Sequence, residues 1–450
     1  MMFGKILIAN RGEIAVRIIR ACREMGIRTV AVCSEADREA LHAQLADETV
    51  CIGPDRPKDS YLNMEQLLSA ALSSGAEAIH PGFGFLSESS RFARLTGQYG
   101  LVFIGPSPES MEQMGNKAMA RSVMMKAGVP VVPGSEGVLK SAREAYKAAA
   151  RIGYPVMIKA AAGGGGKGMR IARKPEDFRK MFETAQMETR SAFGDDGMYL
   201  EKFVENARHI EFQILADSFG NVVHLGERDC SIQRRHQKLI EESPSLAVTP
   251  RLRKKMGADA IKAAKAVKYA SAGTIEFLLA PDGEYYFMEM NTRIQVEHPV
   301  TEMVTGRDLV QEMIQIAAGE KLSFEQEDVR FQGHAMECRI NAEDPEQGFR
   351  PCPGKVEELH FPGGFGVRVD SALYAGYEIP SCYDSMLAKL IVHSSSREDA
   401  VRKMCSALGE TVIGGVKTNV DFLYDLLHEK AFQDADVQSI NRMLEERCAK

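Results

Sequence analysis

The segment from Gly273 to Glu297 constrains the fold of this chain more than any other. Two runs rich in β-branched and aromatic residues flank the dipeptide Asp282-Gly283, which is typical of a β-hairpin with a two-residue type I′ turn. Such a turn places Pro281 opposite Glu284 and fixes the register of both strands, because side chains alternate between the two faces of a sheet. The segment therefore predicts a hairpin with one apolar face and one face that carries charges.

Two carboxylates lie directly opposite each other in this register. Glu276 faces Glu289, with Asn291 on the same face, while the other face is predicted to be core (Ile275, Phe277, Leu279, Tyr286, Met288 and Met290). Opposed carboxylates about 5 Å apart repel by about 3 kcal/mol at an effective dielectric constant of about 20. A divalent cation offsets that repulsion, and carboxylate and amide oxygens are ligands that magnesium accepts beside phosphate oxygens. The register therefore predicts a metal site.

The alternative is that these residues face solvent, as Glu on a strand commonly does. Against free exposure, the same face also carries Leu278, Ala280, Tyr285 and Phe287. The alternation continues beyond Asn291 and adds a cation, an amide and a third carboxylate: Arg293, Gln295 and Glu297. This composition favours a binding site over a solvated surface.

The composition limits the class of protein and its partners. With 450 residues, 44% of them hydrophobic, the chain is long enough for about three domains with sizeable cores. A net charge of −6 gives no general attraction to nucleic acid or to an anionic membrane. The 9 cysteines are scattered without a CxxC pair, as in reduced proteins of the cytosol, and no signal peptide or membrane-spanning stretch is apparent. We expect a cytoplasmic protein that binds neither nucleic acid nor membranes.

The N-terminal part alternates between apolar strands and helical runs. A strand begins at Lys5, further strands are predicted at 29–33, 49–52, 77–80 and 101–104, and helices at 13–25, 38–46, 61–73 and 89–97. This order predicts a doubly wound parallel sheet. The first strand ends in Asn10-Arg11-Gly12, with one glycine where a dinucleotide fingerprint has three, so NAD is not expected. The segment HPGFGFL from His80 follows a carboxyl end of the sheet, where such folds bind ligands, although alone it is more simply a glycine-rich turn.

A second unit follows a boundary marked by Pro and Gly at 130–137. Its strand PVMIKA leads into AAGGGGKG at 161–168 and then into another strand. That following strand excludes the Rossmann use of the glycines, and the residue after Lys167 is not the Ser or Thr of a P-loop. A glycine-rich turn between strands suits a flexible cover over phosphates, with Lys159 and Lys167 to pair with them. A protein kinase is excluded because HRD and DFG motifs are absent.

The stretch from 228 to 238 holds five basic residues (Arg228, Arg234, Arg235, His236 and Lys238), and the acidic pair Glu241-Glu242 follows it. The run forms either a local anion site or a solvated basic face, and the pattern alone leaves both open. After it, helices are predicted at 250–268, capped by Thr249, and at 305–318, and a strand at 334–341.

Several long strings resemble the biotin carboxylase family of the ATP-grasp superfamily: IANRGEIAVRIIRA, HPGFGFLSE, GGGGKGMR, ERDCSIQRRHQK, EFLL, EMNTRIQVEHPVTE and HAMECRINAEDP. The resemblance covers essentially the whole chain. It implies an α/β fold with a doubly wound parallel N-terminal domain (1–114), an ATP-grasp domain with a glycine-rich lid (115–330, lid about 131–204), and a mixed α+β C-terminal domain (331–450).

The resemblance implies an activity as well. Biotin would be carboxylated with bicarbonate and ATP through carboxyphosphate, as the first half-reaction of acetyl-CoA carboxylase and of fatty acid synthesis. The alternative is the same subunit of another acyl-CoA or 2-oxo acid carboxylase. Rival hypotheses are an ATP-grasp ligase with a different acceptor and a nucleotide-binding regulatory subunit.

The resemblance also implies residue roles, position by position. The ATP phosphates would be bound by Lys117, Lys159, Gly163, Gly164, Gly165, Gly166, Lys167 and Gly168; adenine by Glu201, Lys202, Phe203 and Val204; and ribose by His209, Gln233 and His236. Magnesium or manganese would be bound by Glu276, Glu289 and Asn291, and bicarbonate by Lys238, Arg293, Gln295, Val296 and Glu297. The biotin site would hold Arg339, beside the ureido oxygen, and Phe83. The family commonly has Tyr at the position of Phe83, so aromatic packing is kept and the hydroxyl group is absent.

Within this set, Glu297 is expected to take the proton of bicarbonate, Arg293 and Lys238 to hold the anion, and Arg339 to stabilise the oxyanion of biotin. The expected partners are a biotin carboxyl carrier protein, carboxyltransferase subunits and a second copy of the chain. Positions that match those used for pairing are Arg20, Glu24, Phe365 and Arg368. The sequence has no Met-Lys-Met triplet, and the nearest string, Met125-Lys126-Ala127, has helical patterning. We therefore expect biotin on a separate polypeptide.

Overall fold

The computed structural model describes residues 2–135, 137–160, 169–193, 196–235 and 237–448. The predicted phosphate-binding loop at 163–168, including Lys167, and the predicted ribose contact His236 lie outside these ranges. The chain divides into two compact units. The first holds the residues up to Val129, Arg208–Phe277 and those from Glu289 onward, and the second holds Pro130–Ala207 and Leu278–Met288. Within the described ranges, no helix is long and apolar enough to cross a lipid bilayer.

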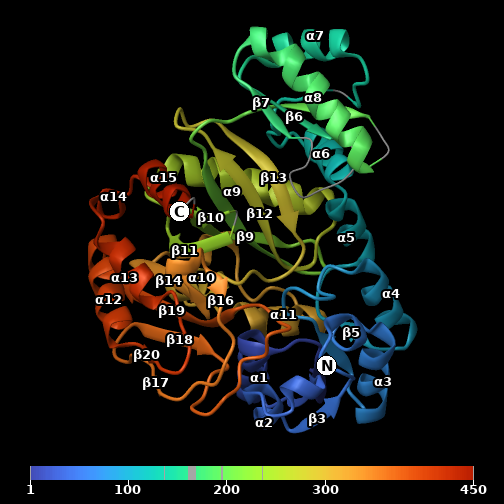
Figure 1. Cartoon of the computed structure of the whole chain (residues 1–450). Coiled ribbons are helices and arrows are strands. Elements are labelled where there is room, and N and C mark those ends of the chain that lie inside the picture. The colour runs from blue at the N-terminus through green and yellow to red at the C-terminus, as the bar shows by residue number, and fades with distance from the viewer. Residues whose placement is uncertain (1, 136, 161–168, 194–195, 236, 449–450) are drawn as a thin grey trace. The chain divides into compact units, whose positions relative to one another are not determined.

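A parallel sheet begins the first unit (Figure 1), in the order β3-β2-β1-β4-β5. Its strands are β1 (Lys5–Ile8), β2 (Arg28–Cys33), β3 (Glu48–Cys51), β4 (Ala78–His80) and β5 (Val102–Phe103), and the helices between them include α1 (Gly12–Glu24), α2 (Leu41–Leu45), α3 (Met64–Ser74) and α4 (Ser90–Gln98). Ile6 and Ile8 pack with residues of α1, whereas Leu7 packs with Leu67 of α3. Because successive side chains of a strand point to opposite faces, both faces are covered. The prediction of a doubly wound parallel sheet is confirmed.

A large sheet follows in the order β13-β12-β9-β10-β11-β14-β19-β18, and most of its residues belong to the first unit. Its strands are β9 (Arg208–Ala216), β10 (Val222–Arg234), β11 (Gln237–Ser243), β12 (Ser271–Leu279), β13 (Tyr285–Asn291), β14 (His334–Asn341), β18 (Val367–Ser371) and β19 (Met386–Ser394). The pairs from β9 to β18 along this order are antiparallel. Of the basic run, Arg228 and Arg234 lie on β10 and Lys238 lies on β11, whereas Arg235 lies in the turn that follows β10.

Helices pack on this sheet and carry its hydrophobic cores. They are α9 (Pro250–Ala266), α10 (His298–Thr305), α11 (Leu309–Ala317), α12 (Arg397–Glu410), α13 (Val420–His428), α14 (Lys430–Gln433) and α15 (Val437–Cys448). Thr249 caps α9, as predicted, by accepting a hydrogen bond from the Leu252 amide. Shorter elements complete the unit: α5 (Pro108–Gly115), α6 (Lys117–Lys126), β15 (Glu343–Asp344), β16 (Arg350–Pro351), β17 (Leu359–His360) and β20 (Val412–Ile413).

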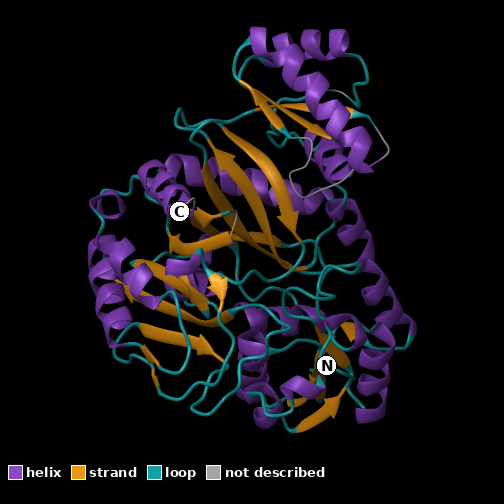
Figure 2. Cartoon of the chain, in the orientation of Figure 1, coloured by secondary structure: helices purple, strands orange, loops and turns teal. Residues whose placement is uncertain are grey.

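The second unit is a three-stranded antiparallel sheet with two helices (Figure 2). Its elements are α7 (Ala142–Ile152), β6 (Val156–Ala160), β7 (Arg170–Ala172), α8 (Pro175–Phe193) and β8 (Met198–Lys202). Ala145 and Ala149 of α7 and Phe178 and Phe182 of α8 are buried against the strands. The predicted order of helix, strand, glycine-rich connection, strand, helix and strand is confirmed for the described residues.

The turn of the central hairpin differs from the prediction. The Gly283 amide donates to the Ala280 carbonyl, and the Ala280 amide to the Glu284 carbonyl, so the loop has three residues and Pro281 does not face Glu284. Gly283 alone in the loop has positive φ, at +87°. Pro281 fixes φ near −65° at the second position of a type I turn, and glycine then takes the left-handed position that closes a bulged hairpin.

This one-residue change reverses the predicted faces beside the turn. Tyr285 and Phe287, predicted on the charged face, are buried, whereas Tyr286 and Met288, predicted in the core, are only half-buried. Met290 is buried, so the alternation breaks between Phe287 and Met290. The strand also ends at Asn291, and the residues that follow lead through a loop into α10, a helix that the sequence pattern did not predict.

Candidate functional site

Lys238 is the centre of a buried cluster of charges on the large sheet. Its Nζ donates to Glu211 Oε2 at 2.7 Å and to Glu297 Oε1 at 2.5 Å, and lies 3.4 Å from Glu276 Oε1. The three carboxylates come from β9, from the residue that precedes α10, and from β12. One ammonium group is thus shared by three acids in a space that water barely enters, since only 14% of the Lys238 side chain is exposed.

Arg228 lies beneath this cluster and is fully buried. Its Nε donates to Glu211 Oε1 at 2.5 Å, and its Nη atoms donate to Gln213, Thr301 and Thr274. The guanidinium group therefore fixes the carboxylate of Glu211 and links β10 to β9, β12 and α10. The basic run that the sequence left open is not a solvated face at Arg228 or Lys238.

Glu297 connects the Lys238 cluster to Arg339. The Arg339 Nη2 atom donates to Glu297 Oε2 at 2.9 Å, and its Nε atom donates to Glu241 Oε1 at 2.6 Å. Glu297 is completely buried, and both of its oxygens accept from cations. The carboxylate therefore lies between the residue expected at bicarbonate and the residue expected at biotin.

The cations set the ionisation of the cluster. Burial would raise the pKa of Glu297, but Lys238, Arg339 and Arg228 outweigh it and hold that pKa well below its usual value. Burial would likewise lower the pKa of Lys238, but Glu211 and Glu297 outweigh it and raise that pKa. Glu297 is therefore an anion with a free electron pair for a proton, and Lys238 is a cation.

Amide and imidazole nitrogen atoms surround the carboxylate of Glu276. Its Oε1 accepts from Asn291 Nδ2 at 2.8 Å and from Gln295 Nε2 at 3.2 Å, and His209 Nε2 lies 2.9 Å from its Oε2. Burial would raise the pKa of Glu276, but Lys238 and His209 lower it to about 2. The predicted common face of Glu276 and Asn291 agrees with this contact. An ionised carboxylate beside an amide is a donor set that suits magnesium.

Glu289 is the most accessible of the predicted metal ligands. Its carboxylate is 38% exposed, and its Oε2 lies 3.6 Å from Nζ of Lys117, the predicted phosphate contact at the start of α6. Lys117 itself is 89% exposed. These two side chains are available to a ligand without breaking a buried network.

Three side-chain acceptors and the Ile294 carbonyl hold the Arg293 guanidinium group in place. It donates to Glu88 Oε2 at 3.0 Å, to Gln295 Oε1 at 3.0 Å and to Asn291 Oδ1 at 3.2 Å. The next part of the loop is supported from β19, where the fully buried Lys389 donates to the Val296 carbonyl at 2.9 Å. The predicted bicarbonate residues thus occupy one short loop with fixed side chains.

The other predicted residues lie as follows. In the first unit, Gln233 Nε2 and His209 Nδ1 are 3.0 Å apart, and Phe83 lies with its ring centroid 5.9 Å from Lys389 Nζ. In the second unit, Lys159 pairs with Glu201, Lys202 Nζ donates to the carbonyls of Gly153 and Tyr154, and the Phe203 amide, just before Val204, donates to the Pro155 carbonyl.

Five residues of the cluster were not assigned from sequence: Glu88, Glu211, Arg228, Glu241 and Lys389. Glu211 and Lys389 lie between buried apolar residues of their strands, whereas Arg228 and Glu241 stand beside other charged residues of theirs. A charged residue between apolar neighbours was the available signal for Glu211 and Lys389, because burying a charge is costly unless it is paired. Glu88 had no comparable signal, since it lies in the loop after HPGFGFLS.

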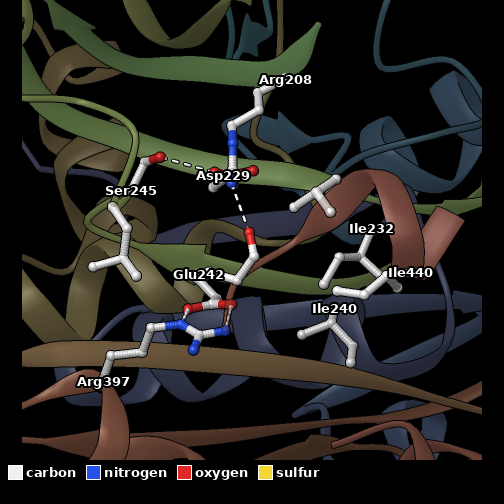
Figure 3. A pocket seen from close by; sticks show the side chains of 11 residues that line it. Arg208, Asp229, Ile232, Ile240, Glu242, Ser245, Arg397 and Ile440 are labelled. Atoms are coloured by element: carbon white, nitrogen blue, oxygen red, sulfur yellow. Dashed lines mark hydrogen bonds and ion pairs between the residues drawn. The ribbon is translucent and has the colours of Figure 1, made fainter. Parts of the chain in front are cut away.

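A separate pocket on the large sheet carries paired charges (Figure 3). It is lined by Arg208, Asp229, Ile232, Ile240, Glu242, Ser245, Leu246, Arg397, Ala435, Val437 and Ile440. Arg208 points to Asp229, and Arg397 binds both oxygens of Glu242 at 2.7 and 3.0 Å. Its volume of about 20 Å³ has room for about one water molecule. These contacts brace β10, β11 and the C-terminal helices.

The Glu242 contacts predict a pH-dependent contribution to stability. Burial would raise the pKa of Glu242, but His334 and Arg397 lower it from 4.5 to about 2. Replacing Glu242 by Gln should lower the free energy of unfolding at pH 7 by about 3 kcal/mol, since each pKa unit corresponds to about 1.4 kcal/mol. The folded-state pKa is depressed, so the difference from the native protein should shrink as pH falls from 4.5 toward 2.

Urea unfolding of both proteins between pH 7 and pH 3 measures this difference. A matched control is Glu410→Gln, because Glu410 lies 3.1 Å from His360 in a similar pair that is 48% exposed at the carboxylate. Exposed pairs contribute little, so this variant should remain close to native. Equal losses in the two variants would contradict the expectation.

Family comparisons divide the chain into three matched segments. The profile described as "Biotin carboxylase, N-terminal domain" matches residues 2–111, and "Biotin carboxylase C-terminal domain" matches residues 337–443. Between them, "Carbamoyl-phosphate synthase L chain, ATP binding domain" matches residues 116–325.

Individual relatives are similar over nearly their whole length. "Biotin carboxylase" of Nostoc sp. is 57% identical over 439 residues, which cover 98% of each protein. A crystal structure of the Hydrogenobacter thermophilus 2-oxoglutarate carboxylase biotin carboxylase domain dimer, with MgADP, ADP and bicarbonate, is 55% identical with a TM-score of 0.88 and 96% coverage of each chain. The biotin carboxylase domain of a thermophilic 2-oxoglutarate carboxylase bound to bicarbonate is 53% identical, with a TM-score of 0.93 and the same 96% coverage of each.

Proposed function

The chain belongs to the biotin carboxylase family, and from this premise we propose how its own residues carry out the reaction. The enzyme is an ATP-dependent ligase that carboxylates biotin with bicarbonate. One observation carries the assignment of roles: Glu297 is held between Lys238 and Arg339.

Lys238 and Arg293 bind bicarbonate, and Glu297 removes its proton. In the ligand-free arrangement, Lys238 donates to Glu297 at 2.5 Å and thereby lowers the proton affinity of that carboxylate. An arriving bicarbonate anion competes for the same ammonium group, so the hold on Glu297 weakens as the substrate binds and its basicity rises. Deprotonated bicarbonate then attacks the γ-phosphorus of ATP, giving carboxyphosphate and ADP. Gln295 and the Val296 backbone help to fix the attacking oxygen in line.

Arg339 serves the second step, in which biotin becomes a nucleophile at its ureido nitrogen. Carboxyphosphate yields carbon dioxide and phosphate, and the phosphate accepts the ureido proton. The negative charge that develops on the ureido oxygen is stabilised by the buried guanidinium group of Arg339. Phe83 packs against the biotin ring without a hydroxyl group.

Magnesium would be held by Glu276, Glu289 and Asn291, and it would neutralise charge on the ATP phosphates. Lys117 and Lys159, with Gly163, Gly164, Gly165, Gly166, Lys167 and Gly168, bind the phosphates, while Glu201, Lys202, Phe203 and Val204 bind adenine, and His209, Gln233 and His236 lie at the ribose. We also propose the domain limits 1–114, 115–330 and 331–450.

A further part of the proposal is the molecule that finally receives the carboxyl group from biotin. We propose that the enzyme is the biotin carboxylase subunit of acetyl-CoA carboxylase and acts in fatty acid synthesis in the cytoplasm. Its partners are a biotin carboxyl carrier protein and carboxyltransferase subunits, and it forms a homodimer. The similarity to a 2-oxoglutarate carboxylase domain supports a 2-oxo acid as the second candidate acceptor. Identification of the carrier and carboxyltransferase that purify with the native protein distinguishes the two.

Steady-state assays test the function directly. ATP hydrolysis by the purified protein should depend on bicarbonate and rise when free biotin is added, and radiolabelled bicarbonate should appear in carboxybiotin. The mass of the protein should show no covalent biotin, because the sequence lacks a Met-Lys-Met triplet and because Met125 and Lys126 are the last two residues of helix α6. A rate of ATP hydrolysis that does not change when biotin is added would contradict the carboxylase assignment.

A further inference from the structure

Two buried glutamates face each other behind Arg339. Glu241 on β11 pairs with Glu337 on β14 in the register of the antiparallel sheet, so their side chains leave the sheet on the same face. Neither side chain is exposed to water. Neither oxygen of Glu337, nor Oε2 of Glu241, has a hydrogen-bond partner among the described residues. A buried acid without a partner is costly as an anion, so this arrangement requires a proton.

Cations lie near Glu337, but none among the described residues bonds to it. The charged groups around it are Glu241 on β11, Arg339 on β14, Lys389 on β19 and Glu297 at the start of α10. Arg339 donates to Glu241 and Glu297, and Lys389 donates to the Val296 carbonyl and pairs with Glu13 at 3.1 Å. Three acids therefore surround Arg339, and it bonds to two of them.

The ionisation of the pair follows from burial. Burial raises the pKa of Glu337 well above its usual value; Lys389 and Arg339 oppose this effect, and Glu241 and Glu297 add to it. Burial also raises the pKa of Glu241, to about 7, although Arg339 and Lys238 oppose it and Glu297 adds to it. Near neutral pH the pair thus holds one proton, on Glu337, and begins to take up a second.

The two bonds of Arg339 have different fates during the reaction. When Glu297 takes the proton of bicarbonate, it becomes a weaker acceptor for Arg339 Nη2, and that donor becomes available to the ureido oxygen. Glu241 Oε1 lies 2.6 Å from Arg339 Nε and 2.5 Å from Arg339 Nη2, and these contacts do not involve the reacting groups. An anionic Glu241 therefore keeps the guanidinium group in place while its other side changes partner.

We propose that Glu241 is the positioning residue of Arg339, and that Glu337 is a neutral carboxylic acid whose proton allows Glu241 to remain charged. This inference rests on the proposed function for its consequence in catalysis, but its central claim, the neutral Glu337, does not. As pH falls below neutral, Glu241 also takes up a proton and loses its hold on Arg339. Turnover with biotin should fall accordingly on the acid side.

Infrared difference spectroscopy tests the proton on Glu337 without any activity. At pH 8, the spectrum of the native protein minus that of Glu337→Gln should contain the C=O band of a protonated carboxyl group, at higher frequency than carboxylate bands. Gln has nearly the same shape as the neutral acid, so this variant should fold and turn over close to native. A difference spectrum with only carboxylate bands would overturn the proposal, even if the protein proved to have another function.

Kinetics test the role of Glu241. Glu241→Gln replaces one charge-assisted hydrogen bond by a neutral one, and kcat with biotin should fall by about 10- to 100-fold. ADP binding, measured by calorimetry, should stay native, and the acid limb of the kcat profile should flatten because its titrating group is gone.

The matched control is Glu242→Gln, one residue along the same strand, where the carboxylate binds Arg397. At temperatures where the Glu242→Gln protein is folded, its kcat and the fall of kcat at acid pH should be the same as in the native enzyme. A Glu241→Gln enzyme with native kcat and pH profile, or a control with the same kinetic loss, would overturn the positioning role. If Glu241→Gln does not fold, the infrared measurement still decides whether Glu337 is neutral.

Discussion

Glu297→Gln should lower kcat by at least about 10²-fold while leaving ATP affinity within a few-fold of native, because a positioned general base contributes about 10² to 10⁴ in rate. Gln keeps the shape of the side chain and still accepts one hydrogen bond, but it has no electron pair that takes a proton at neutral pH. The substitution therefore removes the proton acceptor without emptying the space between Lys238 and Arg339. Initial rates of biotin-dependent ADP formation and calorimetric binding of ADP measure the two effects separately.

The control for this prediction is Glu320→Gln, an exposed acid after α11. It should have native kcat and native ADP affinity. Because Glu297 is completely buried and bonds to two cations, thermal unfolding of the variant must be measured as well. A folded Glu297→Gln protein with near-native turnover would show that bicarbonate loses its proton elsewhere.

The alternation of strands and helices was sufficient to predict the N-terminal sheet, since its central strands are short, mostly apolar runs such as Lys5–Ile8 that must be covered on both faces. The turn at Pro281–Gly283 was mispredicted because two local preferences compete there. Asp-Gly favours a two-residue turn, but the preceding proline favours a type I turn with one more residue, and the second preference prevails. A one-residue change then reversed the faces of Tyr285 to Met288.

Helix α10 was missed for a similar local reason. The period-two pattern of polar residues from Asn291 to Glu297 reads as a strand, yet the chain leaves the sheet after Asn291. His298-Pro299 then begins a helix, with proline at a position where its missing amide costs nothing. The end of the strand depends on the contacts of Arg293 with Glu88, a residue 205 positions away, which no local pattern contains.

Site residues that lie within one contiguous motif were predictable from the sequence. Site residues that come together only because their strands pair in the sheet were not. Lys238, Arg293 and Glu297 lie within recognisable strings, and the last two come close in one loop. Glu241 was visible only as part of a charge run, and its partner Glu337 lies 96 residues further on, across the β11–β14 pair. Burial decides the properties of such a pair, and burial is a result of the whole fold.

Glu289→Gln should raise the magnesium concentration needed for half-maximal rate and lower kcat by about 10²-fold or more, because a bound cation stabilises the charge on the reacting phosphates by several kcal/mol. Glu289 is 38% exposed, and its nearest cation, Lys117, is 89% exposed. Since the substitution disturbs no buried network, the protein should unfold at the native temperature, and the kinetic loss reports on the ligand and not on folding. The matched control is Glu284→Gln, an exposed acid on the same hairpin whose backbone carbonyl closes the turn; its magnesium dependence should be native.

The rate of Glu289→Gln should recover in part as magnesium is raised, because Glu276 and Asn291 remain as oxygen donors. Titration of bound manganese by electron paramagnetic resonance gives a second measure of affinity that needs no turnover. A variant with a reduced rate but native dependence on magnesium and native manganese affinity would remove Glu289 from the metal site.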